Sequence, residues 1–250
     1  MKTASLIELE NISKTYPGSL VPAVDDLSLA IPLNARFGLL GPNGAGKTTT
    51  INILCGLLQY DNGHIRINGM SLERKYRKIR RMIGLVPQDI ALYESLTARE
   101  NLRFIGEMYG LKGKALRHRI NESLEKVGLT QHAGKAVKAF SGGMKRRINL
   151  VAGILHEPEI LILDEPTSGV DVQSRSLILQ LLFELNEKGT TIIYTSHYLE
   201  EAEELCNHIA IIDAGQVIIK GETAGIITGH PGCNDLESVF LHLTGRKLRD

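Results

Sequence analysis

The stretch "FGLLGPNGAGKTT", residues 37–49, decides the fold of this chain. It begins with a continuous apolar run, typical of a strand buried on both faces of a parallel sheet, and it leads into the helical pattern "TTTINILCGLL". Between them lies a match to GxxxxGK(S/T), in which glycines let backbone N–H groups surround phosphate oxygens. In such a loop the lysine reaches the β and γ phosphates and the hydroxyl ligates Mg²⁺. The pattern predicts a nucleotide-binding loop made of Gly41, Pro42, Asn43, Gly44, Ala45, Gly46, Lys47, Thr48 and Thr49.

Two further apolar runs, "ILIL" at 160–163 and "TTIIYT" at 190–195, indicate more strands of the same parallel sheet. Asp164-Glu165 follows the first run, and Ser196-His197 follows the second. Because open parallel sheets bind ligands at the carboxyl ends of their strands, we expect these polar groups to lie on the edge that carries the glycine-rich loop.

Each of these polar groups has a chemical role available beside a nucleotide. Asp164 can hold Mg²⁺, and Glu165 can orient or deprotonate the attacking water. His197 can bond a γ-phosphate oxygen, and Gln88, in "GLVPQD", can contact the metal or the water. The structural alternatives are carboxylates that cap a turn, a buried histidine and a loop glutamine.

The base is predicted to be adenine, partly by elimination. The segment "NEKG" does not supply the NKxD pattern usual in guanine-specific proteins. Tyr16, in "SKTYPG", can stack on a purine, and stacking tolerates any base. A tyrosine of the core or of its rim is the alternative.

Composition limits the function classes. The chain has 250 residues, 43% of them apolar, and a formal net charge of +1, which argues against a dedicated nucleic-acid binder. No run of 18 uncharged apolar residues occurs, and glutamates stand where a signal peptide needs apolar residues, so we expect a cytosolic protein. The widely spaced Cys55, Cys206 and Cys233 are expected to be buried thiols.

One segment is strongly basic: "RKYRKIRR", residues 74–81, contains six basic residues in eight positions. The pattern favours a solvated helix face with Ile79, Met82 and Ile83 turned inward. Contact with anionic lipid head groups is the alternative.

The remaining segments predict an α/β protein of the P-loop type with two additions. "LIELENI", "LSLAI", "HIRINGM" and "IAIIDAGQVIIKG" alternate as half-buried strands do and suggest an antiparallel layer beside the main sheet. Residues 88–156 read as an inserted helical subdomain. We therefore expect one domain over 1–250, with 1–87 and 157–220 as core and β-subdomain and 221–250 as a C-terminal extension.

A second glycine pair opens a second helix, in "KAFSGGMKRRINLV", residues 138–151. Ser141 is a good N-cap, but two glycines in the first turn cost about 1 kcal/mol each relative to alanine. Unhindered backbone at a helix N-terminus is an anion site, so a phosphate explains "SGG" better than helix stability does.

Together these motifs resemble those of the ATP-binding-cassette (ABC) ATPases over nearly the full length of the chain. The loop at 41–49 looks like Walker A, "VPQD" the Q-loop, "FSGGMKRR" the signature motif, "ILILDEP" Walker B, "SGVD" the D-loop and "TSH" the H-loop. The order matches the family order. The usual signature begins with leucine and ends in glutamine, whereas Phe140 and Met144 stand there in this chain.

The resemblance implies that two cassettes meet head to tail, with each signature closing over the ATP of the other. Ser141, Gly142, Gly143 and Met144 would then contact the partner's ATP, and Asp171 would lie at the seam. The signature variant, "SHYLEEAE" and the ending "LESVFLHLTGRKLRD" look like bacterial drug and nodulation-factor exporters, whose permease is a separate membrane polypeptide. The segment "DIALYESLTARENL" would receive that permease.

The expected function is therefore an exporter ATPase that uses ATP and Mg²⁺, pairs with a second cassette of the same kind, and sits peripherally on the inner face of the cell membrane. A soluble ABC ATPase of ribosomes or DNA is the alternative. Such proteins carry two cassettes in one chain or long coiled coils, and this sequence has neither.

Overall fold

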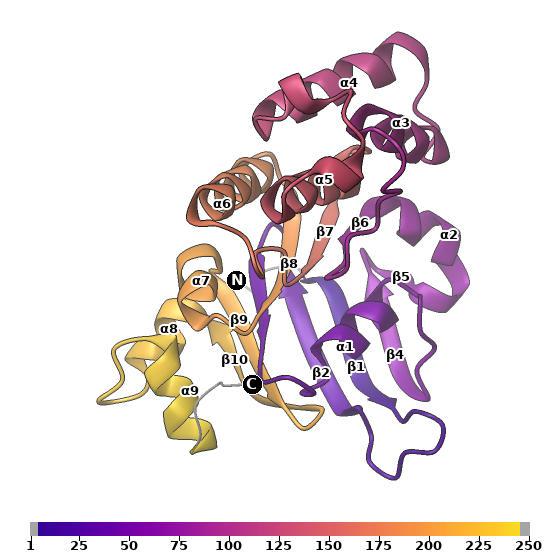
Figure 1. Cartoon of the computed structure of the whole chain (residues 1–250). Coiled ribbons are helices and arrows are strands. Elements are labelled where there is room, and N and C mark those ends of the chain that lie inside the picture. The colour runs from indigo at the N-terminus through magenta and orange to yellow at the C-terminus, as the bar shows by residue number, and fades with distance from the viewer. Residues whose placement is uncertain (1–4, 246–250) are drawn as a thin grey trace. The chain divides into compact units, whose positions relative to one another are not determined.

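The computed structural model of the chain describes residues 5–245, and these form two compact units (Figure 1). The first unit contains the chain up to Arg80 and again from Thr191 onward. The second unit is Arg81–Thr190. The subdivision into core, helical insertion and C-terminal extension remains a prediction, and the last five residues of that extension lie outside the described residues.

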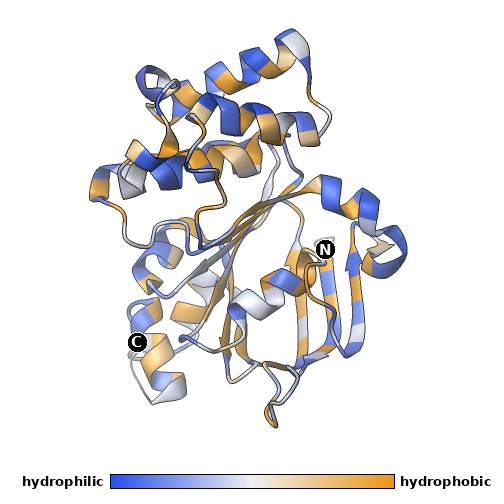
Figure 2. Cartoon of the chain, turned by 45° about the vertical axis from the view of Figure 1, so that its right-hand side comes forward, coloured by the Kyte–Doolittle hydropathy of each residue, from blue (hydrophilic) through white to orange (hydrophobic). Residues whose placement is uncertain are grey.

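An antiparallel sheet in the first unit has the strand order β2-β1-β4-β5. Hydrophobic and hydrophilic residues alternate along its strands (Figure 2), as expected where one face packs on a core. Asn68 and Gly69 both have positive φ, 49° and 69°, so they form the tight turn that the sequence predicts between β4 and β5. The strands are β1 (Ser5–Lys14), β2 (Val24–Pro32), β4 (Asn62–Ile67) and β5 (Met70–Ser71).

The parallel strands of the first unit are the apolar runs of the sequence. β3 (Arg36–Leu40) lies between β8 (Thr191–Ser196) and β9 (His208–Asp213) and is parallel to both. β10 (Gln216–Glu222) pairs antiparallel with β9. The predicted hairpin at 209–221 is thus confirmed, but its assignment to the antiparallel layer is wrong, because β9 continues the sheet of β3.

Helices of the first unit follow its strands. α1 starts directly after the glycine-rich loop, and α7 follows β8. The basic helix α2 buries Ile79 and Met82 and exposes all six of its arginines and lysines, and Ile83, the first residue of β6, is buried too, which confirms the solvated-face interpretation. The helices are α1 (Lys47–Leu54), α2 (Leu72–Met82, whose last residues belong to the second unit), α7 (Leu199–Leu205), α8 (Thr223–Thr228) and α9 (Leu236–Thr244).

The second unit combines two parallel strands with four long helices. β6 (Ile83–Val86) pairs in parallel with β7 (Ile160–Asp164), whose five residues are all buried. The helices are α3 (Ala98–Met108), α4 (Gly113–Lys126), α5 (Gly142–Ile154) and α6 (Val172–Glu187), with short 3₁₀ turns at Thr130–His132 and Val137–Ala139.

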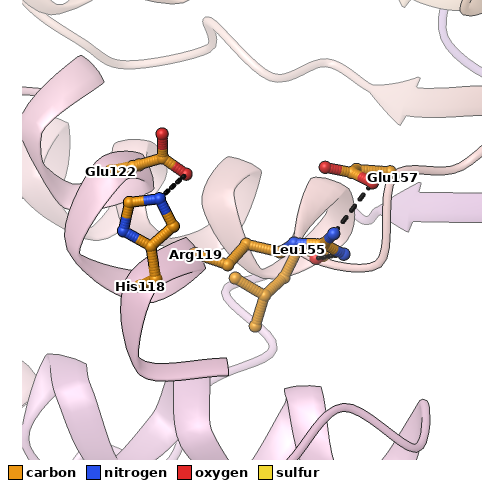
Figure 3. Close-up of polar contacts among 5 residues, drawn as sticks. All are labelled: His118, Arg119, Glu122, Leu155 and Glu157. Carbon is orange, nitrogen blue, oxygen red and sulfur yellow. Dashed lines mark hydrogen bonds and ion pairs between the residues drawn. The ribbon is translucent and has the colours of Figure 1, made fainter. Parts of the chain in front are cut away.

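A single arginine of α4 closes the loop after α5 (Figure 3). Arg119 donates to the Leu155 carbonyl at 3.2 Å and pairs with Glu157 at 2.9 Å. Glu157 has a positive φ of 55°, which a non-glycine residue adopts only when its surroundings hold it there. The pair between His118 and Glu122, at 3.6 Å, lies on the exposed face of the same helix.

Candidate functional site

The glycine-rich loop places an uncapped helix N-terminus at the end of β3. α1 begins at Lys47, and its N-cap is Gly46, with a φ of 102° and no side-chain hydrogen bond to the first turn. The first turn contains no acidic residue. Because the first N–H groups of a helix lack intrahelical partners, this end of α1 suits an anion.

Three glycines shape the loop for two different reasons. A Cβ on Gly41 would stand 2.1 Å from the Ile212 carbonyl oxygen, and one on Gly46 would stand 2.4 Å from that of Ala23. Close backbone packing therefore demands these two glycines. Gly44 has a φ of 80° and nothing within 4 Å of an added Cβ, so its backbone conformation, and not a lack of space, favours glycine.

The Lys47 side chain of the loop folds back onto the backbone of the loop. Lys47 is only 6% exposed, and its Nζ donates to the carbonyls of Gly41 (2.8 Å) and Pro42 (3.0 Å). The Tyr16 hydroxyl lies 3.3 Å from Thr49 Oγ1, and 42% of the tyrosine is exposed beside the loop. Of the other predicted residues, Asn43, Gly44 and Thr48 are exposed and Ala45 is buried.

The next strand brings the predicted histidine to the same edge. Leu40, the last residue of β3, is in register with Ser196, the last residue of β8, so His197 follows at the end from which the loop departs. His197 is half-buried, and its ring lies 4.1 Å from that of Tyr198 between centroids.

A second group of predicted residues meets within the second unit, at the ends of β6 and β7. Gln88 Nε2 donates to Glu165 Oε2 at 3.3 Å. Asp164 and Glu165 are buried, 4% and 8% exposed. Glu165 has a positive φ of 48°, which is uncommon for a non-glycine residue and is found preferentially at functional sites.

The two glycines of the signature motif are not equivalent. Ser141 caps α5 as predicted, with its Oγ accepting from the Met144 N–H at 3.3 Å. A Cβ on Gly142 would meet nothing within 4 Å, whereas one on Gly143 would stand 2.4 Å from Ser174 Oγ. We expected a phosphate to explain both glycines; packing against α6 is a sufficient reason for Gly143.

Asp171 is exposed and caps the N-terminus of α6. Its carboxylate accepts from the Ser174 N–H at 2.8 Å and from the Ser174 hydroxyl at 2.9 Å. These bonds, together with the charge of Arg147, hold the pKa of Asp171 below its ordinary value. Arg147 also donates to the Gly143 carbonyl at 3.3 Å, so the signature and the D-loop share contacts within one unit.

Two residues that bear on this site were not predicted: Arg146 donates to the Gln88 carbonyl, and Asn149 bonds the backbone on both sides of Gln88. The available sequence signals were the cation pair "RR" at the end of the signature motif and an amide in the otherwise apolar run "INLVAGIL". Neither signal reveals a partner about sixty residues earlier in the chain.

The three cysteines differ in burial. Cys55 and Cys206 are buried as expected, but the expectation is wrong for Cys233, which is partly exposed because it lies in the turn before α9. No helix within residues 5–245 has the length and apolarity required to cross a membrane.

Comparison with known proteins identifies the family. The model of the ABC transporter family matches residues 24–168. Linearmycin resistance ATP-binding protein LnrL of Bacillus subtilis (strain 168) is 50% identical over 216 residues, 86% of this chain and 69% of the relative. Nod factor export ATP-binding protein I of Cupriavidus metallidurans is 39% identical over 233 residues, 93% of this chain and 76% of the relative.

Solved structures agree with the sequence relatives. An ATP-binding subunit of an ABC transporter superposes with a TM-score of 0.87 at 31% identity, covering 96% of this chain and 100% of that chain. The dimeric ATP-binding cassette MJ0796, bound to ADP and Pi, has a TM-score of 0.79 at 28% identity, covering 86% and 98%. The chain belongs to the ABC transporter family. It is an ATP-binding subunit of that family, an ATPase that hydrolyses ATP to drive transport, and the predicted fold class and family are confirmed.

Proposed function

We propose that this chain powers export through a separate membrane permease; the name of one relative says that it is an ATP-binding protein of Nod factor export. The ATPase chemistry is supported by two groups of residues, which are called half-sites below. One is an uncapped helix N-terminus with a buried lysine, and the other is a buried carboxylate pair with a glutamine bonded to it. Each half-site has a distinct role in hydrolysis.

The phosphate loop binds the triphosphate. N–H groups of the loop and of the first turn of α1 donate to phosphate oxygens, and Lys47 transfers its bonds from the loop carbonyls to the β and γ phosphates. Tyr16 stacks on the adenine from its exposed position beside Thr49. Gly41 and Gly46 allow the close backbone packing that gives the loop its shape.

Glu165 is the proposed general base. Its carboxylate accepts the proton of the attacking water, and the Gln88 amide holds that carboxylate in one orientation. His197 is proposed to donate to a γ-phosphate oxygen from the end of β8.

The residues predicted to hold Mg²⁺ have donor atoms that suit this ion. Asp164 offers a carboxylate, Thr48 a hydroxyl and Gln88 an amide oxygen, all of which are hard oxygen ligands. When bound, Mg²⁺ neutralises charge on the β and γ phosphates. Gln88 Oε1 stays available for this role while Nε2 donates to Glu165.

The signature is proposed to contact the ATP of a second cassette, a second copy of this chain. Ser141 and Gly142 are exposed at the start of α5, with open space around Gly142. Gly143 and Met144 continue the same turn and Asp171 adjoins it, at the proposed dimer seam. A dimeric cassette of known structure supports this arrangement, since it resembles this chain over 86% of its length.

The permease is proposed to dock on the loop and helix that follow Gln88. This segment exposes an aromatic pair, Tyr93 (57% exposed) and Phe104 (43% exposed), whose rings meet edge to face at 5.5 Å. Exposed aromatic clusters mark protein interfaces. Docking there would keep the ATPase at the inner face of the cell membrane.

The test is to tag the Glu165→Gln variant in its native host and identify what co-purifies from detergent-solubilised membranes. A multi-span membrane protein in stoichiometric amount supports the transporter assignment and leads to the substrate. Ribosomal or DNA-associated partners instead would contradict the export proposal and leave the ATPase chemistry standing.

A further inference from the structure

The loop that contains Gln88 is fastened to one face of the signature helix α5. Asn149, 2% exposed, donates through Nδ2 to the Pro87 carbonyl (3.3 Å) and accepts through Oδ1 from the Ala91 N–H (3.1 Å). One turn earlier, Lys145 pairs with Glu94 at 2.5 Å. The backbone before and after Gln88 is therefore held by side chains of a single helix.

Arg146 makes the contact nearest the chemistry. Its Nη1 donates to the main-chain carbonyl of Gln88, the residue whose side chain donates to Glu165. Burial lowers the pKa of Arg146, while the negative charges of Asp89 and Glu165 raise it. The guanidinium stays charged, so the proposed base Glu165 interacts with a fixed positive charge.

Two hydrogen bonds thus connect α5 to the proposed base through one residue. Arg146 bonds the Gln88 carbonyl, and the side chain of the same Gln88 bonds Glu165. Arg146 lies four residues after Gly142, about one helical turn from the helix end that is proposed to face the second cassette's phosphate. A helix this short transmits a displacement of its N-terminus to Arg146 as a rigid body.

We propose that Arg146 is a positioning residue for hydrolysis, which holds Gln88 against Glu165 and ties their alignment to the position of the signature helix. The inference rests on the proposed roles of Gln88 and Glu165. Arg146 lies on α5, touches the Gln88 backbone and needs no contact with ATP of its own. Its loss should therefore slow turnover while leaving ATP binding intact.

The first test compares Arg146→Met, which keeps the length of the side chain, with Arg146→Lys and with the control Arg117→Met. Misplacing a catalytic group by about 1 Å can cost a hundredfold, so we expect kcat to fall by about tenfold to a hundredfold in Arg146→Met with KM for ATP near wild type. Lysine keeps one donor and the charge, and should restore part of kcat. Arg117→Met, which removes an exposed cation from α4, should stay within about twofold of wild type.

The second test is a double-mutant cycle with Gln88→Ala. If Arg146 acts through Gln88, adding Arg146→Met to Gln88→Ala should cost little further kcat, because the contact it supports is already gone. Fully additive losses would overturn the proposal, as would a rise in KM with unchanged kcat. Melting temperatures of all variants show whether a substitution unfolds the protein. If Arg146→Met does so, Arg146→Lys is compared with wild type instead.

The same measurements separate this inference from the proposed chemistry. If Glu165→Gln abolishes turnover and Arg146→Met does not lower it, the base role stands and the positioning role falls. If Glu165→Gln hydrolyses ATP at the wild-type rate, the proposed base role itself fails, and with it the reason for holding Gln88 against Glu165.

Discussion

Gly143 lies so close to Asp171 that a Cβ added to the glycine would stand 2.7 Å from Asp171 Oδ2. The neighbouring Gly142 has no atom within 4 Å of the same position. Two adjacent glycines of one motif therefore answer different demands. Gly143 permits α5 to pack on the start of α6, and Gly142 leaves open space at the helix end, where we propose that a phosphate binds.

This difference predicts opposite results for two alanine substitutions. Gly143→Ala overpacks the contact with Ser174 and Asp171, so we expect it to lower the free energy of unfolding by about 1–3 kcal/mol. Gly142→Ala has space for its methyl group and should keep or slightly raise stability, since alanine favours the helix.

Calorimetry of the two variants without nucleotide measures the stability difference, and ATP-dependent dimerisation measures the ligand role. Gly142→Ala is expected to weaken dimerisation despite its intact fold. Equal destabilisation by both substitutions would show that the open space at Gly142 plays no part.

Glu165→Gln should retain ATP binding and lose turnover. The amide has nearly the shape of the carboxylate but cannot accept the proton of water, so we expect hydrolysis to fall by about a hundredfold or more. Phosphate release and binding of a fluorescent ATP analogue measure the two effects separately. Unchanged turnover would remove Glu165 from the role of base.

The cysteines should differ in reactivity. Burial raises the pKa of Cys206 to about 12, so its thiol stays protonated and shielded at pH 8, and Cys55 is buried as well. Iodoacetamide should therefore add one group to the folded protein, at Cys233, and three in denaturant. Mass spectrometry counts the adducts, with Cys233→Ser as the control that should remain unlabelled when folded.

His156 should make stability depend on pH. Its ring stacks on Tyr109 with 3.7 Å between centroids, and Nε2 donates to the Ile83 carbonyl at 3.1 Å. Nδ1 is buried and has no hydrogen-bond partner among the described residues, so a proton added there would lack an acceptor. Burial accordingly lowers the pKa of His156.

The direction of the effect follows from proton binding. Below its ordinary pKa of about 6.5, the unfolded state gains a proton at His156 that the folded state does not bind, so the stabilisation is complete above that pH and is lost as the pH falls. The melting temperature should drop more steeply from pH 7.5 to 5.5 in wild type than in His156→Phe, which keeps the stacking. Parallel curves would rule out this contribution.

Local patterns predicted most of the fold. The three apolar runs that the sequence predicts as parallel strands are β3, β7 and β8, and the ends of β3 and β8 are in register. Strand burial was predictable because it depends on neighbouring residues. The hairpin of β9 and β10 was also predictable, but not the sheet that it joins. Alternation reports which faces are buried and contains no information on which strand lies alongside.

The contacts of Arg146 and Asn149 could not be predicted from local sequence patterns, because such patterns do not show which segments lie side by side. Their partners lie 58 to 62 residues earlier in the chain, and only the packing of α5 brings them together. The packing of Gly143 against Asp171 likewise depends on how α5 meets α6. Motifs identify the residues of this site, and tertiary contacts decide which of them support one another.

The central claim is that the signature of one chain closes over the ATP of another. Light scattering of Glu165→Gln at saturating ATP tests it, with and without Ser141→Arg, which places bulk and charge at the exposed cap of α5. We predict a dimer for Glu165→Gln in ATP and a monomer once Ser141→Arg is added. A monomer in both cases, or a dimer unaffected by Ser141→Arg, would contradict the account.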